Sequence, residues 1–195
     1  MGRISQFENR SSTRDLQKHV IYLIGLPGVG KTTVGGLIAK KTGFVLLDHN
    51  VTYGDICNFL ERGSRSAHVL NGLLHVSILE TLISSGIKGV VSTLSIVRHP
   101  TIKTALNAVN LLEKKKIQVS FIKLECDWEE HQRRVRMPSR KLLHKTNTIK
   151  KLKTYLAQPC FEGLKSHSPI VINNTKIKAH KCADKIISIL GLRTI

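Results

Sequence analysis

Acidic residues are scarce in this sequence. Thirteen Asp and Glu stand against 31 Lys and Arg, so the formal net charge is +18 and the sequence pI is about 10.1. A surface of that charge attracts polyanions such as nucleotides, RNA, DNA or anionic lipids, although a basic face that only contacts solvent has the same composition. The charge is concentrated, because nine basic residues and no acid lie between His131 and Lys153. This cluster favours a segment that handles phosphate groups, and the net charge keeps nucleic acid among the candidate partners.

Paired cysteines, long apolar runs and an apolar N-terminus are also missing. The longest apolar run, 20–26, is far shorter than the roughly 18 residues of a spanning helix, so no membrane span is expected. Residues 1–18 are polar and lack the apolar core of a secretory signal, which predicts a polar leader. The cysteines follow no CxxC or zinc-site spacing, which favours reduced thiols in a cytoplasmic protein: Cys57, Cys126, Cys160 and Cys182.

The remaining residues, 19–195, alternate between strand patterns and helical patterns. Apolar, β-branched runs predict five strands, at 19–24, 44–47, 89–94, 118–124 and 170–172. Apolar residues at helical spacing predict six helices, at 31–41, 56–60, 67–84, 101–116, 149–157 and 178–190. This alternation predicts a single α/β domain whose parallel sheet is covered by helices on both faces. Binding sites of such sheets lie beyond the carboxyl ends of the strands.

A phosphate-binding loop follows the first predicted strand. Residues 25–32 match GxxxxGK[ST] at every fixed position, between a strand and a helix. Glycines let backbone N–H groups turn inward around a phosphate, and the positive end of the next helix points to the same place. We expect Lys31 to bridge the β and γ phosphates of ATP and the Thr32 hydroxyl to hold Mg²⁺. The predicted nucleotide-binding residues of the loop are Gly25, Pro27, Gly28, Val29, Gly30, Lys31, Thr32 and Thr33.

Other motifs narrow the class of P-loop protein. The guanine-reading motif NKxD and the switch motif DxxG are absent from the sequence, which argues against a GTPase. Motor and AAA-type ATPases usually end a strand in Asp or Asp-Glu, whereas the predicted strands here end near Asp48, Thr93 and Asp127. Small-molecule kinases often lack a strong acidic pair and have about the length of this chain. The motifs therefore favour a kinase.

Over residues 19–191 the chain resembles the P-loop small-molecule kinases, such as shikimate, gluconate and adenylate kinases and chloramphenicol phosphotransferase. Within them it is most similar to shikimate-kinase-like ATP-binding proteins. The resemblance rests on His49-Asn50, Val91-Ser92-Thr93, Cys126-Asp127, Arg133-Arg134-Val135, Pro138-Ser139-Arg140 and Lys145. It implies the three-layer P-loop NTPase fold, a five-stranded parallel sheet in the order 2-3-1-4-5, and ATP with Mg²⁺ as cofactors.

Two departures from shikimate kinases concern the acceptor side. Those enzymes carry a DxD on the second strand and a glycine cluster after the third, where this chain has a single Asp48 and the residues 92–95, STLS. The departures argue against shikimate as the acceptor. We expect Asp48 to orient the acceptor hydroxyl as a base or to hold Mg²⁺ through water, although an aspartate that caps a turn has the same position. The other acceptor-side candidates are His49, Asn50, Thr93 and Ser95.

The basic segment at about 131–148 lies where the resembling kinases carry a lid. Guanidinium groups match phosphoryl oxygens in a planar, bidentate geometry. The resemblance therefore assigns two lid arginines, and the predicted catalytic residues are Lys31, Asp48, Arg134 and Arg140. After the fifth predicted strand, Asn173 lies where these kinases wrap the adenine base.

The sequence thus predicts an ATP-dependent phosphotransferase that moves the γ-phosphate to a hydroxyl of a small molecule. A polynucleotide 5′-hydroxyl kinase is one alternative, which would use the +18 surface. Against it, only 5% of the residues are aromatic, and the basic–aromatic interleaving that stacks bases is lacking. A nucleotide-binding regulator without turnover is the other alternative, supported by the missing acidic pair.

Overall fold

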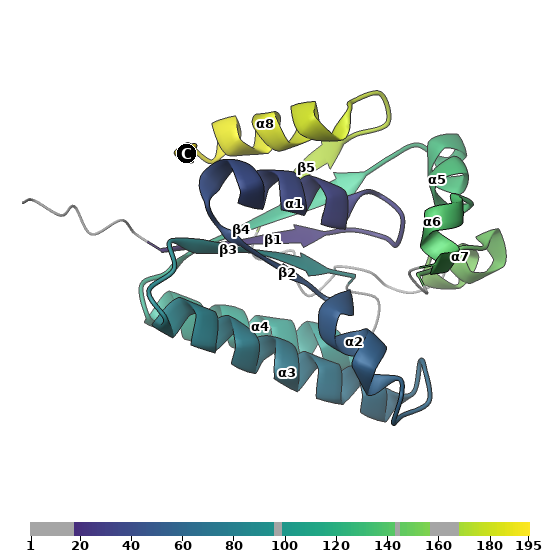
Figure 1. Cartoon of the computed structure of the whole chain (residues 1–195), viewed down its shortest axis with the longest axis horizontal. Coiled ribbons are helices and arrows are strands. Elements are labelled where there is room, and N and C mark those ends of the chain that lie inside the picture. The colour runs from purple at the N-terminus through teal and green to yellow at the C-terminus, as the bar shows by residue number, and fades with distance from the viewer. Residues whose placement is uncertain (1–17, 96–98, 143–144, 157–167) are drawn as a thin grey trace, which may run out of the picture.

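Five parallel strands form one sheet, in the order β2-β3-β1-β4-β5. The computed structural model describes residues 18–95, 99–142, 145–156 and 168–195 (Figure 1). The predicted leader up to residue 17, Cys160 and positions 143–144 of the lid lie outside this part of the chain. The strands are β1 (His19–Ile24), β2 (Val45–Asp48), β3 (Gly89–Leu94), β4 (Gln118–Glu125) and β5 (Ile170–Asn173). The three-layer α/β fold and the strand order implied by the resemblance are confirmed.

The sheet separates two apolar cores, because side chains of a strand alternate between its faces. Tyr22 of β1 belongs to the core on one face, which is covered by α3 and α4. Its neighbour Leu23 belongs to the core on the other face, which is covered by α1 and α8 (Figure 1). The covering helices are α1 (Lys31–Thr42), α3 (Arg65–Ser84), α4 (His99–Lys114) and α8 (Ala179–Ile189).

The remaining helices lie at the carboxyl end of the sheet. They are α2 (Asn50–Ile56), α5 (Trp128–Val135), α6 (Pro138–Leu142) and α7 (Ile149–Leu156). Figure 1 shows α5, α6 and α7 grouped beyond the arrowheads of β1 and β4. The loop at 25–30 leaves β1 at this end, so the phosphate-binding motif and the basic segment come together where the sheet rule places a site.

The prediction for α2 was wrong. A helix was expected at 56–60, but α2 runs from Asn50 to Ile56 and turns follow it. The side chain of Asp48 accepts a hydrogen bond from the Asn50 backbone N–H at 3.1 Å, so a turn directly after β2 leads into the helix. The buried Ile56 therefore ends α2, whereas its apolar side chain had been taken for the start of a helix.

Two helices in the basic segment, α5 and α6, were not among the six helices predicted with bounds. In α5, Glu130 pairs with Arg133 and with Arg134, which lie one turn further along the helix. The helix buries only His131 and Val135. Two buried positions give too weak a periodic signal for sequence analysis, whereas the ion pairs on the remaining faces support the helix.

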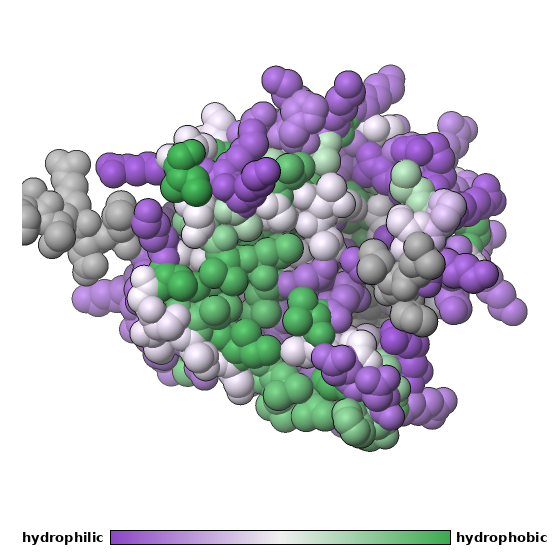
Figure 2. Space-filling model, viewed as in Figure 1, coloured by the Kyte–Doolittle hydropathy of each residue, from purple (hydrophilic) through white to green (hydrophobic). Residues whose placement is uncertain are grey.

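α3 is the one helix, within the described ranges, that is long and apolar enough to cross a membrane by length and composition. The search for uninterrupted apolar runs missed it, since Asn71 and His75 interrupt the pattern. These polar side chains and Leu79 are buried in the fold. The opposite side of the helix leaves Leu73 58% exposed, and Figure 2 shows apolar residues gathered over α3 at the lower edge of the molecule.

Candidate functional site

The loop between β1 and α1 has the backbone of a phosphate cradle. Gly25, Gly28 and Gly30 have φ angles of 146°, 100° and 101°. A Cβ on Gly28 would lie 2.7 Å from a methyl carbon of Val135, so neither the backbone nor the space admits a side chain there. Gly30 caps α1 without a side-chain hydrogen bond. The first N–H groups of α1 are thus left for an incoming anion.

Lys31 is buried within this loop. Its ammonium donates to the carbonyl oxygens of Gly25 and Leu26, at 2.7 and 3.0 Å. Burial lowers the pKa of Lys31 to about 7; the charge of Asp48 opposes this shift, and two neighbouring cations add to it. An incoming phosphate would exchange these two carbonyl partners for stronger, charged ones.

Side chains from α5 and from the loop after β5 hold the outside of the cradle. His131 donates from Nε2 to the carbonyl oxygen of Pro27 at 2.8 Å. The carbonyl oxygen of Val29 accepts from the Asn174 side-chain amide at 2.8 Å and from Arg134 at 3.2 Å. Arg134 also donates to Asn174 Oδ1 at 2.7 Å. The predicted lid arginine is therefore already bound within the frame that shapes the loop.

The ends of β2 and β3 place a carboxylate beside the cradle. Asp48 is 7% exposed, and its Oδ1 accepts from the Thr93 hydroxyl and from the Asn50 side chain, both at 2.9 Å. Burial raises the pKa of this carboxyl, but hydrogen bonds, first that from Thr32, and the charge of Lys145 outweigh burial and bring the pKa to about 2. Asp48 is ionised at neutral pH.

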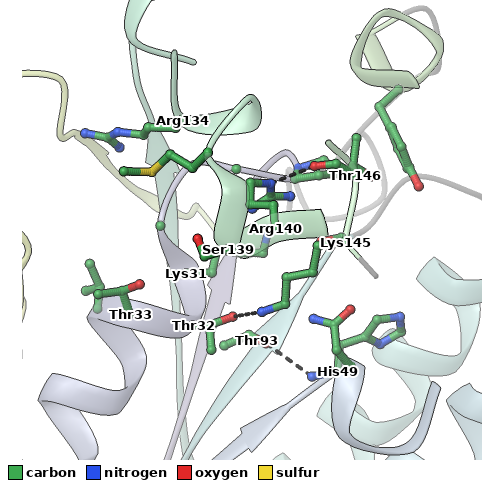
Figure 3. Close-up of a pocket in the computed structure, with 18 of the residues that line it drawn as sticks. Lys31, Thr32, Thr33, His49, Thr93, Arg134, Ser139, Arg140, Lys145 and Thr146 are labelled. Carbon is green, nitrogen blue, oxygen red and sulfur yellow. Dashed lines mark hydrogen bonds between the residues drawn. The ribbon is translucent and has the colours of Figure 1, made fainter. Parts of the chain in front are cut away.

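Thr32 and Asp48 form an oxygen corner that suits a hard cation. The Lys145 ammonium lies 3.3 Å from Thr32 Oγ1 (Figure 3). It also lies 3.7 Å from Asp48 Oδ2, so a cation already stands against both oxygens. A hydroxyl and a carboxylate are ligands that Mg²⁺ takes in proteins. Across the residues that the structure describes, His, Cys, Asp and Glu form no cluster of three or more. Magnesium here would complete its shell with water and nucleotide oxygens.

The cradle and the corner open into one cavity of about 910 Å³ (Figure 3). Glu130 is the one acid among the described residues of its lining, and it is paired with Arg133 and Arg134. Hydrophilic residues also dominate the surface of this end of the molecule in Figure 2. The lining of the cavity is therefore strongly cationic. Its basic lining residues are Lys31, Arg62, Arg133, Arg134, Arg140, Lys145, Lys151, Lys176 and Lys178.

Planar side chains from α2 and α3 form another part of the cavity wall. The ring of Tyr53 stacks with His49 at 6.0 Å between centroids and with His68 at 5.2 Å. The guanidinium carbon of Arg62 lies 5.4 Å from the centroid of the Tyr53 ring, within cation–π range. The sequence analysis named His49 but missed the other three, because it placed the helix that carries Tyr53 too late in the chain.

A buried polar network lies behind His49. The side-chain amide of Asn71 donates to Nδ1 of His49 at 3.1 Å, and His75 shares a 2.8 Å hydrogen bond with the Ser92 hydroxyl. The other nitrogen of His75 has no hydrogen-bond partner among the described residues. Burial lowers the pKa of His49 and of His75 to about 4, so both rings are neutral at pH 7.

The structure brings most of the predicted site residues to one cavity. Gly25, Val29 and Asp48 are not among the residues that line it, and the Arg140 side chain donates to the Thr146 carbonyl oxygen at 2.6 Å. Asn173 is exposed outside the cavity and donates to Asp127, while its neighbour Asn174 lines it. Successive residues at a strand end point to opposite sides, so Asn174 and not Asn173 faces the cavity. The predicted residues that line the cavity are Pro27, Gly28, Gly30, Lys31, Thr32, Thr33, His49, Asn50, Thr93, Ser95, Arg134 and Arg140.

A protein-family model described as an AAA domain matches residues 20–159, which is more than half of the chain. The chain belongs to this family. The matched part of the AAA domain includes the cradle, the Asp48 corner and the helices α5 to α7. A search of curated proteins found no match to the sequence.

Solved structures with the fold of this AAA domain include several kinases. Shikimate kinase from Acinetobacter baumannii in complex with shikimate is 22% identical, with a TM-score of 0.60 over 88% of this chain and 92% of that chain. APS kinase from Mycobacterium tuberculosis in complex with AMPPNP and APS is 15% identical, with a TM-score of 0.60 over 90% and 98%. A sugar kinase from a Janibacter species is 16% identical, with a TM-score of 0.58 over 90% and 95%. These similarities show a shared P-loop fold.

Proposed function

We propose that this protein is a kinase that moves the γ-phosphate of ATP to a hydroxyl group of a small molecule. One observation carries the proposal: the phosphate cradle, Thr32 beside Asp48, and the cationic wall with its planar stack all line one cavity. Phosphoryl transfer requires two substrates to meet in line within a site that neutralises charge. The fold that this chain shares with known kinases supports the same reaction.

Each part of the site has a role in that reaction. The N–H groups of the cradle and Lys31 would hold the phosphates, and bound Mg²⁺ at Thr32 would supply further charge neutralisation. Asp48, with a pKa of about 2, is a weak proton acceptor. We therefore assign it to orienting the acceptor hydroxyl or a magnesium-bound water. The adenosine would lie toward Asn174 and the loop that follows it.

The acceptor is best matched by a molecule that carries an anionic group. Arg62 and Lys151 line the cavity, and neither forms an ion pair with a described residue. Tyr53 and His68 add flat, partly exposed rings beside Arg62. A hydroxyl compound that bears a carboxylate or a phosphate ester would satisfy these side chains, while a neutral polyol would leave the cations unpaired.

Calorimetry with Mg²⁺-ATP and a screen of anionic hydroxyl compounds test the proposal. We expect wild-type protein to bind ATP and to phosphorylate at least one compound of that class. Lys31→Ala should abolish nucleotide binding, and Asp48→Asn should keep binding but lose transfer by a hundredfold or more, as expected for a group that orients a reactant. The exposed Lys40→Ala is the matched control. A wild-type protein that binds ATP but transfers phosphate to none of the compounds, and whose ATP binding is unchanged by Asp48→Asn, would instead indicate a regulator without turnover.

Nucleic acid ends are the second candidate acceptor, and the +18 charge together with the cationic cavity favours them. The test is transfer of labelled phosphate to the 5′ hydroxyl of short oligonucleotides over a range of salt concentrations. A polynucleotide kinase would show a steep loss of affinity with salt. Transfer to free anionic alcohols but not to oligonucleotides would leave the small-molecule assignment.

A further inference from the structure

A lysine occupies the corner where the metal of the nucleotide would bind. The ammonium of Lys145 donates to Thr32 Oγ1 at 3.3 Å (Figure 3) and lies 3.7 Å from Asp48 Oδ2. The side chains of Asp48 and Lys145 are only 10% and 18% exposed, respectively. Lys145 therefore contacts the same two groups, a hydroxyl and a carboxylate, that are expected to hold Mg²⁺.

The position of Lys145 is fixed by its own turn. Its backbone N–H donates to the Arg140 carbonyl oxygen at 2.9 Å. The side chain of Arg140 in turn donates to the carbonyl oxygen of Thr146 at 2.6 Å. The backbone of Lys145 and of Thr146 is thus hydrogen-bonded to Arg140 of α6, and these bonds direct the ammonium toward the corner. The lysine is a built part of the site rather than a loose surface side chain.

The negative charge at the corner balances one cation. Among the described residues, Asp48 is the acid with which Lys145 forms an ion pair, and its Oδ1 is already engaged by Thr93 and Asn50. The other oxygen has to serve either the ammonium or a metal ion. Two cations held side by side against a single carboxylate oxygen would repel each other in a partly buried site.

We propose that Lys145 and a divalent cation compete for the Thr32–Asp48 corner. In the nucleotide-free protein the ammonium neutralises Asp48. With Mg²⁺-ATP bound, the ammonium of Lys145 would be displaced from the corner and would be available to phosphate oxygens in the cavity that Lys145 also lines. The inference rests on the proposed function, because it assumes a metal ion bound with the nucleotide. It assigns to Lys145 a competition with that metal ion that neither the family match nor the structural similarities assign.

Titration of the nucleotide-free full-length protein with Mn²⁺, followed by the resonance signal of the free ion, tests the competition. Lys145→Met removes the charge and keeps the length of the side chain. We expect it to raise Mn²⁺ affinity by roughly tenfold or more, the size of effect that one neighbouring charge has on a proton equilibrium. Lys145→Arg retains a cation and should match wild type. Lys151→Met removes another cation of the same cavity and is the control for general electrostatics.

A second measurement brings in the nucleotide. The gain in ADP affinity on adding Mg²⁺ should be larger for Lys145→Met than for wild type, and Asp48→Asn in the Lys145→Met background should remove that difference. Equal Mn²⁺ affinities of Lys145→Met and wild type, or an equal gain from Lys151→Met, would overturn the inference. A chain that phosphorylates no acceptor would overturn the proposed function alone, because the Mn²⁺ titration needs no acceptor.

Discussion

At the scale of the residue, Lys31 meets two opposing demands. It has to be charged to bind phosphate, yet it is buried and its pKa is about 7. The sequence predicted the position of Lys31, because the cradle motif is local and its spacing is set by backbone geometry. It could not predict the pKa, which depends on burial by distant segments and on the charges of Asp48 and Arg140.

The lowered pKa of Lys31 predicts a pH-dependent affinity for ATP. Above pH 7 the Lys31 amine of the free protein is deprotonated, whereas the phosphate-bound form requires the charged ammonium. ATP binding should therefore take up a proton, and the affinity for ATP should fall by up to about tenfold per pH unit. Below pH 7 the lysine is already charged and this dependence disappears. Calorimetry at pH 8 in two buffers of different ionisation enthalpy measures the uptake. An affinity that stays constant from pH 7 to pH 9 would contradict the assignment.

At the scale of the element, α5 is joined to the cradle rather than lying over it as a detached lid. Arg134 and His131 reach carbonyl oxygens of the loop, and Arg134 also holds Asn174. Sequence analysis recognised the arginines and their charge but gave no bounds for the helix that carries them. Guanidinium chemistry is visible in a sequence, whereas the partner of each guanidinium depends on where the helix packs.

Arg134→Ala should therefore affect both stability and nucleotide binding. Arg134 is 17% exposed, and its loss would remove its hydrogen bonds to Glu130, to the Asn174 side chain and to the carbonyl oxygens of Val29 and Asn174, which we expect to cost about 2 kcal/mol of unfolding free energy. Arg133→Ala is the matched control: this side chain is 62% exposed and pairs with the same glutamate, so its loss should cost less than about 1 kcal/mol. Urea unfolding of both variants measures the difference. Equal losses of unfolding free energy would show that the hydrogen bonds of Arg134 to the loop do not stabilise the protein.

The tight contact of the cradle with α5 gives a second prediction at this scale. Gly28→Ala combines a φ of 100° with a contact of 2.7 Å to Val135, so it should destabilise the protein by about 1–3 kcal/mol and weaken ATP binding. Gly54 lies within α2 and has open space around it. Gly54→Ala should therefore stabilise the protein by about 0.5–1 kcal/mol. Thermal unfolding with and without ATP separates the two effects.

At the scale of the whole molecule, the order of elements was predictable and the cavity was not. Apolar runs and helical spacing indicated the strands and the covering helices, because burial between two layers imposes a period on the sequence. Arg62, Lys145 and Asn174 reach the cavity from loops, where no such period applies. Their positions follow from tertiary packing at the carboxyl ends of the strands.

Buried histidines make the stability of the whole fold sensitive to acid. Burial lowers the pKa of His19, His49 and His75 to about 4 each. In the unfolded chain these rings take up protons near pH 6.5, so their contribution to stability is complete above that pH and is lost as the pH falls toward 4. We expect each ring to account for on the order of 1–3 kcal/mol of that loss.

Urea unfolding at several pH values measures this loss, and variants identify its origin. His75→Gln should flatten the pH dependence between pH 6.5 and 4. The exposed His180→Gln should leave the dependence unchanged. A wild-type stability that is constant over this range would show that the three rings are not held neutral by the fold.

β1 is hydrogen-bonded along its whole length to β3 on one side and to β4 on the other, and every residue in it is buried. Its amide hydrogens reach solvent only when the domain opens as a unit, so deuterium should enter this strand last. The phosphate cradle begins where that strand ends. Fraying of the helices at the rim would therefore leave its anchor undisturbed, and a nucleotide could leave or enter without loosening the part of the molecule that unfolds last.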